Sequence, residues 1–150
     1  MTGYCILARR DAASGQRSAK GKSKEGRYQT GVWALTDKVV VLVTCADLKE
    51  AKRIASAVVE ARLAACVNII GARVRSTYRW KGKVEAARET LLLIKTSRRR
   101  LAALRAEVER LHGYDVPEFI ALPITAGSPA YLNWIDECLA PAAPGKRRKK

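Results

Sequence analysis

Between residues 38 and 140, apolar positions recur with periods that predict alternating strands and helices. Lys38–Thr44 (KVVVLVT) is a continuous β-branched run, typical of a strand that is covered on both faces. Residues 47–62 then carry apolar side chains at three- and four-residue steps, which predicts an amphipathic helix. Its N-cap is Asp47, and Glu50 follows three residues later in a near capping box.

The next two strands are expected to form an unusually long hairpin. An apolar strand begins at Cys66–Ile70 and continues to residue 80 with alternating side chains, one face being cationic and the other half-apolar. Lys81-Gly82-Lys83 makes a tight connection into a partner strand that ends in TLLLIKT, residues 90–96. Such a hairpin cannot bury its tip, including Tyr78 and Trp80, on its own domain, which favours an oligomer built around it.

The rest of the pattern completes a ferredoxin-like plan. Leucines and Val108 recur at helical spacing from residue 101 to a helix end near His112, and residues 118–125 (EFIALPIT) predict a fourth strand. Ser128-Pro129 is expected to cap a final short helix. The order is βαββαβ plus a C-terminal helix, an α+β fold in which two helices pack on one face of an antiparallel sheet.

Charge divides the chain into three parts. Of the net charge of +15, residues 1–37 contribute +4, residues 38–140 contribute +6 and residues 141–150 contribute +5. Residues 1–37 therefore predict a flexible basic extension, or alternatively an organellar transit peptide, since they are rich in Arg and Ser and poor in acids. The closing KRRKK predicts a solvated tail, with a nucleic-acid patch as the weaker alternative. No apolar run is long enough for a membrane span.

The cysteines point to a reducing compartment, so we expect a cytoplasmic protein. Cys5, Cys45, Cys66 and Cys138 are widely spaced and form no C-x-x-C pair. No Ser-His-Asp or Cys-His arrangement, G-x-G-x-x-G motif or P-loop is recognisable, and we do not expect an enzyme.

The only histidine lies in LHGYDVPE, residues 111–118, and allows two interpretations. In the first, His112 ends a helix, Gly113 adopts the left-handed cap, and a cationic imidazole complements the helix dipole. In the second, His112 binds a metal ion, and Asp115 and Glu118 could add oxygen ligands, although pairing with arginines is the alternative for both.

Arg98, Arg99 and Arg100 stand where a helix is expected to begin, and there they oppose the helix dipole. A bound phosphate or other small anion would reverse that penalty. The plainer alternative is a solvated basic turn.

Several segments together resemble one known family. VVVLVT, RLAACVNII, STYRWKGKVE, LLLIKT, LHGYDVPEFIALPI and YLNWI occur in this order over about residues 38–139 and resemble the CutA-type divalent-cation tolerance proteins. The resemblance implies a ferredoxin-like homotrimer, similar to the PII signalling proteins, with Tyr78, Trp80 and Lys81 at the trimer interface. It also implies binding of divalent metal, copper foremost, without an established catalytic activity.

The resemblance further implies metal ligands. The family's proposed cysteine of the LAAC segment falls on Cys66, and its proposed histidine falls on His112. A third ligand, a cysteine of the first strand, falls on Val43, which cannot bind metal; Cys45, two residues later on the same face of the strand, is the candidate substitute. Buried packing is the alternative role for both cysteines. A PII-like module that senses a small anion and signals to a protein partner is the alternative function.

Overall fold

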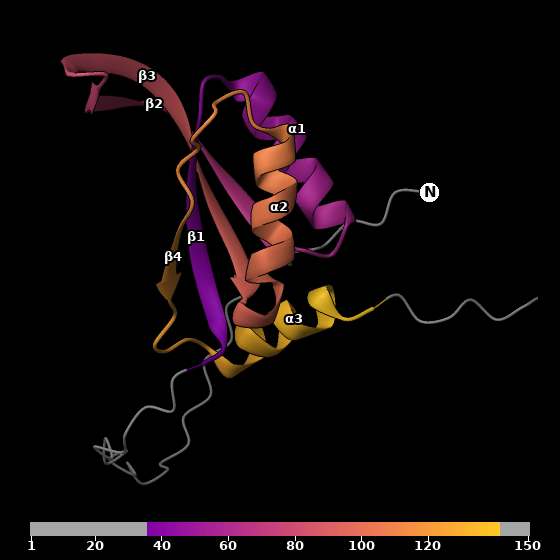
Figure 1. Ribbon diagram of the computed structural model, residues 1–150. Coiled ribbons are helices and arrows are strands. Elements are labelled where there is room, and N and C mark those ends of the chain that lie inside the picture. Colours follow the sequence, from indigo (N-terminus) through magenta and orange to yellow (C-terminus); the bar gives the residue numbers. More distant parts are fainter. Residues whose placement is uncertain (1–35, 142–150) are drawn as a thin grey trace, which may run out of the picture. The chain divides into compact units, whose positions relative to one another are not determined.

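The structure is a computed structural model that describes residues 36–141. Its elements are β1 (Lys38–Cys45), α1 (Leu48–Glu60), β2 (Cys66–Trp80), β3 (Lys83–Ser97), a 3-10 turn (Arg98–Arg100), α2 (Leu101–Leu111), β4 (Ile120–Pro123) and α3 (Pro129–Leu139). The four strands form one antiparallel sheet in the order β2-β3-β1-β4, with α1 and α2 on the same face (Figure 1). This confirms the predicted ferredoxin-like fold. The extension 1–37, apart from its last two residues, and the tail after residue 141 lie outside the described residues.

The core forms where the helices cover the sheet. In β1, side chains alternate so that Val41 and Val43 point toward the helices and are fully buried. Ile54 of α1 and Leu104 of α2 meet them from the other layer, also without exposed surface. Each such side chain contributes about 1.5–3 kcal/mol by leaving water, so this layer fixes how the ends of β1, α1 and α2 lie together.

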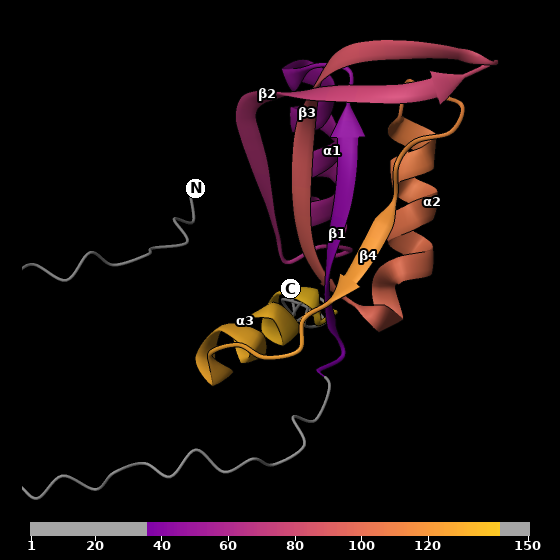
Figure 2. The ribbon, with the colours of Figure 1, turned by 90° about the vertical axis from the view of Figure 1, so that its left-hand side faces the viewer.

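The long hairpin is present as predicted. β2 and β3 pair from Cys66 to Trp80, with an irregularity between Ile70 and Val74. The two-residue connection has left-handed backbone at both positions, φ 46° at Lys81 and 82° at Gly82, as a tight hairpin turn requires. Figure 2 shows the hairpin extending past the end of β1, away from the two-layer body.

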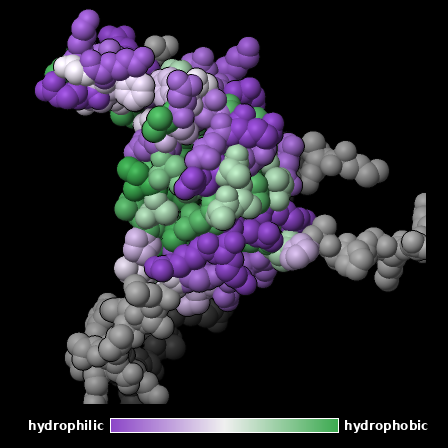
Figure 3. Space-filling view, in the orientation of Figure 1, coloured by the Kyte–Doolittle hydropathy of each residue, from purple (hydrophilic) through white to green (hydrophobic). Residues whose placement is uncertain are grey.

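The other face of the sheet carries apolar side chains that the described residues leave uncovered. Figure 2 looks onto this face, with α1 and α2 behind it. Leu122 and Ile120 of β4 are each 47% exposed, and the register places them beside Val40 and Leu42 of β1. Figure 3 shows apolar side chains gathered over this side of the domain.

Ser128 is the N-cap of α3 and Pro129 its first residue, as predicted, although the Ser128 side chain makes no capping hydrogen bond. Two local expectations need correction. The fourth strand is only four residues long, because just Ile120–Pro123 pair with β1. Gly113 is not a left-handed cap, since Gly82 is the one glycine of the described residues with positive φ.

No helix among the described residues is long and apolar enough to cross a membrane.

Candidate metal site

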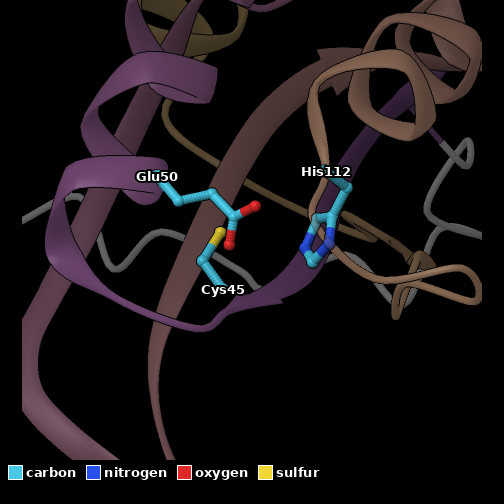
Figure 4. A group of neighbouring side chains, drawn as sticks. All are labelled: Cys45, Glu50 and His112. Carbon is cyan, nitrogen blue, oxygen red and sulfur yellow. The ribbon is translucent and has the colours of Figure 1, made fainter.

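Three side chains with metal-binding atoms converge where β1, α1 and α2 end or begin together. Cys45 is the last residue of β1, Glu50 lies in the first turn of α1, and His112 follows the last turn of α2. One ligand atom from each lies within 4.8 Å of the others (Figure 4). Among the described residues this is the one group of three or more His, Cys, Asp or Glu side chains with such spacing.

The Cys45 thiol is buried and protonated. It shows no exposed surface and lies on the helix-facing side of β1. Burial raises the pKa of Cys45 to about 12, and the nearby carboxylates of Glu50, Glu89 and Asp47 add to the rise because they disfavour a second negative charge. The thiol therefore becomes a thiolate ligand only when a cation takes the place of its proton.

The His112 imidazole contacts backbone groups through both ring nitrogens. Nδ1 accepts a hydrogen bond from the Tyr114 amide at 3.1 Å, so Nδ1 carries the lone pair. Nε2 then carries the proton and donates it to the Thr44 carbonyl at 2.8 Å. The expected cationic cap is therefore replaced by a neutral tautomer, and the last carbonyl of α2, that of Leu111, is satisfied by Arg53 at 2.5 Å.

The Glu50 carboxylate connects the segments before α1 and after α2. One oxygen accepts the Gly113 amide at 2.6 Å, and the other accepts the Ala46 amide at 3.0 Å. The Asp47 carboxylate in turn accepts the Glu50 amide at 2.8 Å, which confirms Asp47 as the N-cap of α1. The sequence pattern identified Glu50 only as a capping residue; its position five residues after Cys45, across a single turn, is the signal that could have added it to the site.

The three donor types suit a transition-metal ion. Thiolate and imidazole favour copper and zinc, whereas magnesium and calcium prefer sites built only from oxygen. Around a four-coordinate ion, neighbouring ligand atoms lie about 3.3–3.8 Å apart, so a group within 4.8 Å needs to contract by at most about 1.5 Å. Side-chain rotations can bring the three ligand atoms this much closer, and the residues present fit such an ion.

Cys66 does not join this group within the chain. It pairs with Lys95 on β3, whereas Cys45 pairs with Thr90, five positions away and on the opposite face of the sheet. Five residues of strand separate them by about 17 Å. Cys66 is partly exposed, and its sulfur lies 4.0 Å from the Asn68 side-chain nitrogen. Metal binding by Cys66 stays a prediction, and Cys66 cannot share an ion with Cys45 of the same chain in this arrangement.

The two carboxylates after His112 also lie outside the group of three. Asp115 is exposed and Glu118 is half-buried, and neither has a ligand atom within the converging set.

Two arginines of the triplet, Arg99 and Arg100, are paired with protein groups. Arg99 lies 3.4 Å from a carboxylate oxygen of Asp37 and 3.3 Å from one of Asp136, and Arg100 donates to the Leu139 carbonyl at 2.7 Å. Buried Lys38 also pairs with both carboxylates, at 2.9 Å to Asp136. The arginines Arg99 and Arg100 and the acids Asp37 and Asp136 line an open hollow of about 650 Å³. The predicted dipole conflict is thus offset at Arg99 by acids from distant parts of the chain.

The predicted interface residues lie at the far end of the hairpin. Tyr78 is 42% exposed and Trp80 is 43% exposed, and Lys81 occupies the turn. Large aromatic side chains that remain this exposed are available for contact with another chain.

The fold and the converging thiol, carboxylate and imidazole define a ferredoxin-like protein of the PII-like type with a candidate cation site. The sequence profile described as "CutA1 divalent ion tolerance protein" matches residues 39–138, and the chain belongs to this family. It is 48% identical over 98 residues to the divalent-cation tolerance protein CutA of Thermus thermophilus, covering 65% of this chain and 94% of that protein.

Further proteins similar to this chain also carry the name CutA. The chain is 47% identical over 97 residues to an Arabidopsis thaliana protein named "Protein CutA, chloroplastic", covering 65% of this chain. The chain spans about half the length, 53%, of that relative and of the CutA protein of mouse. The crystal structure of CutA from Xylella fastidiosa superposes with a TM-score of 0.68 at 40% identity, covering 70% of this chain and all of that one.

Proposed function

We propose that this protein binds a transition-metal ion, copper foremost, through Cys45, Glu50 and His112, and that this binding is its contribution to divalent-cation tolerance. The observation that carries the proposal is the convergence of three different donor types within 4.8 Å from the ends of three elements. The role is binding rather than catalysis.

The donor types support copper over the other common ions. Divalent copper stands at the top of the affinity order for nitrogen, oxygen and sulfur sites, and monovalent copper prefers thiolate. A copper ion is therefore best able to replace the proton of a thiol whose pKa burial raises to about 12.

A chelator-competition titration with monovalent copper under reducing conditions tests the proposal. We expect about one equivalent per chain, and an affinity at least tenfold weaker in Cys45→Ala and in His112→Ala. Cys66→Ala is the matched control, because it removes the same thiol outside the group. Unchanged affinity in Cys45→Ala, with a loss in Cys66→Ala, would contradict the proposed site.

We further propose that the protein assembles as a homotrimer in the cytoplasm. The support for assembly is the uncovered apolar sheet face with Ile120 and Leu122, together with the exposed hairpin aromatics. The name of the Arabidopsis relative assigns that protein to the chloroplast. The location of the protein is therefore tested with one reporter that carries residues 1–37 and a second that carries the full chain.

The alternative of an anion-sensing module has less support. Its predicted arginines are Arg98, Arg99 and Arg100, and the last two already contact a carboxylate or a carbonyl. An anion would have to compete with Asp37 and Asp136 at this surface.

A further inference from the structure

The Tyr114 amide occupies the only lone pair that His112 could offer to a cation. A neutral imidazole has one protonated and one unprotonated nitrogen. The unprotonated Nδ1 accepts the Tyr114 N–H at 3.1 Å, while Nε2 donates to the Thr44 carbonyl at 2.8 Å. A ligating histidine usually donates its second ring N–H to a carbonyl in this way, so the ring already has the tautomer that ligation through Nδ1 needs.

Both possible modes of ligation displace the same amide. Ligation through Nδ1 takes the lone pair directly from the Tyr114 N–H. Ligation through Nε2 moves the ring proton to Nδ1, where it would face the Tyr114 N–H donor to donor. In either case Tyr114 loses its backbone hydrogen bond, while the Glu50 carboxylate has further lone pairs and can keep the Gly113 amide.

We propose that cation binding at Cys45, Glu50 and His112 and attachment of the Tyr114 backbone are mutually exclusive, so that the segment after α2 reports whether the site is occupied. This inference rests on the proposed function and adds the regulation of the same site. In the metal-free protein the Tyr114 amide is hydrogen-bonded to the His112 ring, and binding of the cation breaks this hydrogen bond.

The released residue is connected to the base of the hairpin. Burial raises the pKa of the Tyr114 hydroxyl to about 12, and the nearby Glu89 carboxylate adds to the rise, so the two side chains are neighbours. Glu89 of β3 is only 6% exposed and pairs with Val74, the first β2 residue after the irregularity. Figure 1 shows the segment between α2 and β4 passing the place where the hairpin bends away from the body. Movement of Tyr114 away from His112 would therefore act, through Glu89, on the place where the hairpin leaves the body.

Amide hydrogen exchange of the full-length ¹⁵N-labelled protein, followed by NMR with and without monovalent copper, tests the inference. Monovalent copper has a filled d shell and leaves the spectra unbroadened. We expect the Tyr114 amide to exchange at least tenfold faster at saturation, while the Ala51 amide, which bonds to the Asp47 carbonyl within α1, changes less than twofold. Copper that binds and leaves Tyr114 exchange unchanged would overturn this inference alone; failure of copper to bind would overturn the proposed function as well.

Two substitutions at residue 114 provide a matched second measurement. Tyr114→Pro removes the competing N–H together with the side chain, whereas Tyr114→Ala removes the side chain and keeps the N–H. We expect copper to bind about fivefold more tightly to Tyr114→Pro than to Tyr114→Ala, the equilibrium equivalent of one net hydrogen bond. Equal affinities in two variants that retain the wild-type circular dichroism spectrum would count against displacement of the amide.

Discussion

Replacement of Glu50 by alanine should destabilise the metal-free protein by about 2–4 kcal/mol. The Glu50 side chain is 11% exposed and accepts the amides of Ala46 and Gly113. A hydrogen bond to a charged group contributes about 1.5–3 kcal/mol, so two would contribute about 3–6 kcal/mol. We expect a smaller loss of about 2–4 kcal/mol because both amides lie on exposed residues, where water can replace part of each lost hydrogen bond.

Urea unfolding in the presence of a chelator, with all variants at one protein concentration, measures this effect. Asp47→Ala is the matched control: it removes one N-cap hydrogen bond of the same helix and should cost about 1 kcal/mol. Glu50→Gln keeps the size of the side chain and one acceptor oxygen, so its loss of unfolding free energy should lie between those of Asp47→Ala and Glu50→Ala. A Glu50→Ala protein as stable as Asp47→Ala would refute the view that Glu50 holds the end of α2 to the start of α1.

Three further predictions concern other parts of the domain. Iodoacetamide at pH 8 should label partly exposed Cys66 and spare Cys45, whose pKa of about 12 leaves about one thiol in ten thousand ionised; equal labelling rates would contradict its burial. Lys38 holds the pKa of Asp37 below its ordinary value, so this pair stabilises the fold above about pH 4 and does so less as the pH falls through the folded pKa. In Asp37→Asn the unfolding free energy should therefore fall less on acidification than in the wild type. The difference should be less than about 1 kcal/mol, since Asp37 is 40% exposed. Leu122→Lys on the uncovered sheet face should reduce the mass measured by light scattering from that of a trimer to that of one chain, and an unchanged mass would exclude this face from the interface.

The elements of the domain could be predicted because their signals are local. The β-branched run of β1, the apolar spacing of α1 and the alternation along β2 each depend on residues within one element. The ends of a strand were less predictable, because they depend on how many residues pair with a neighbouring strand. In β4 only Ile120–Pro123 pair with β1, although the apolar pattern extends further.

The site could be predicted only in part, because its contacts join residues far apart in the chain. His112 was correctly placed at the end of α2, but its ring contacts the Thr44 carbonyl, 68 residues away in sequence. Instead of a local glycine cap, Arg53, 58 residues away, satisfies the last carbonyl of the helix. For the same reason the arginine triplet suggested an anion, although Asp37 and Asp136 pair with Arg99. Local patterns can identify a charge that needs a partner, but they cannot show which distant residue supplies it.

The proposed metal ion lies between Cys45, Glu50 and His112. An anomalous-difference map from crystals of the full-length protein grown with copper would locate it. We predict one peak per chain within bonding distance, about 2.0–2.3 Å, of the Cys45 sulfur and a His112 ring nitrogen. A peak beside Cys66 or between subunits, with the Cys45 group empty, would contradict it.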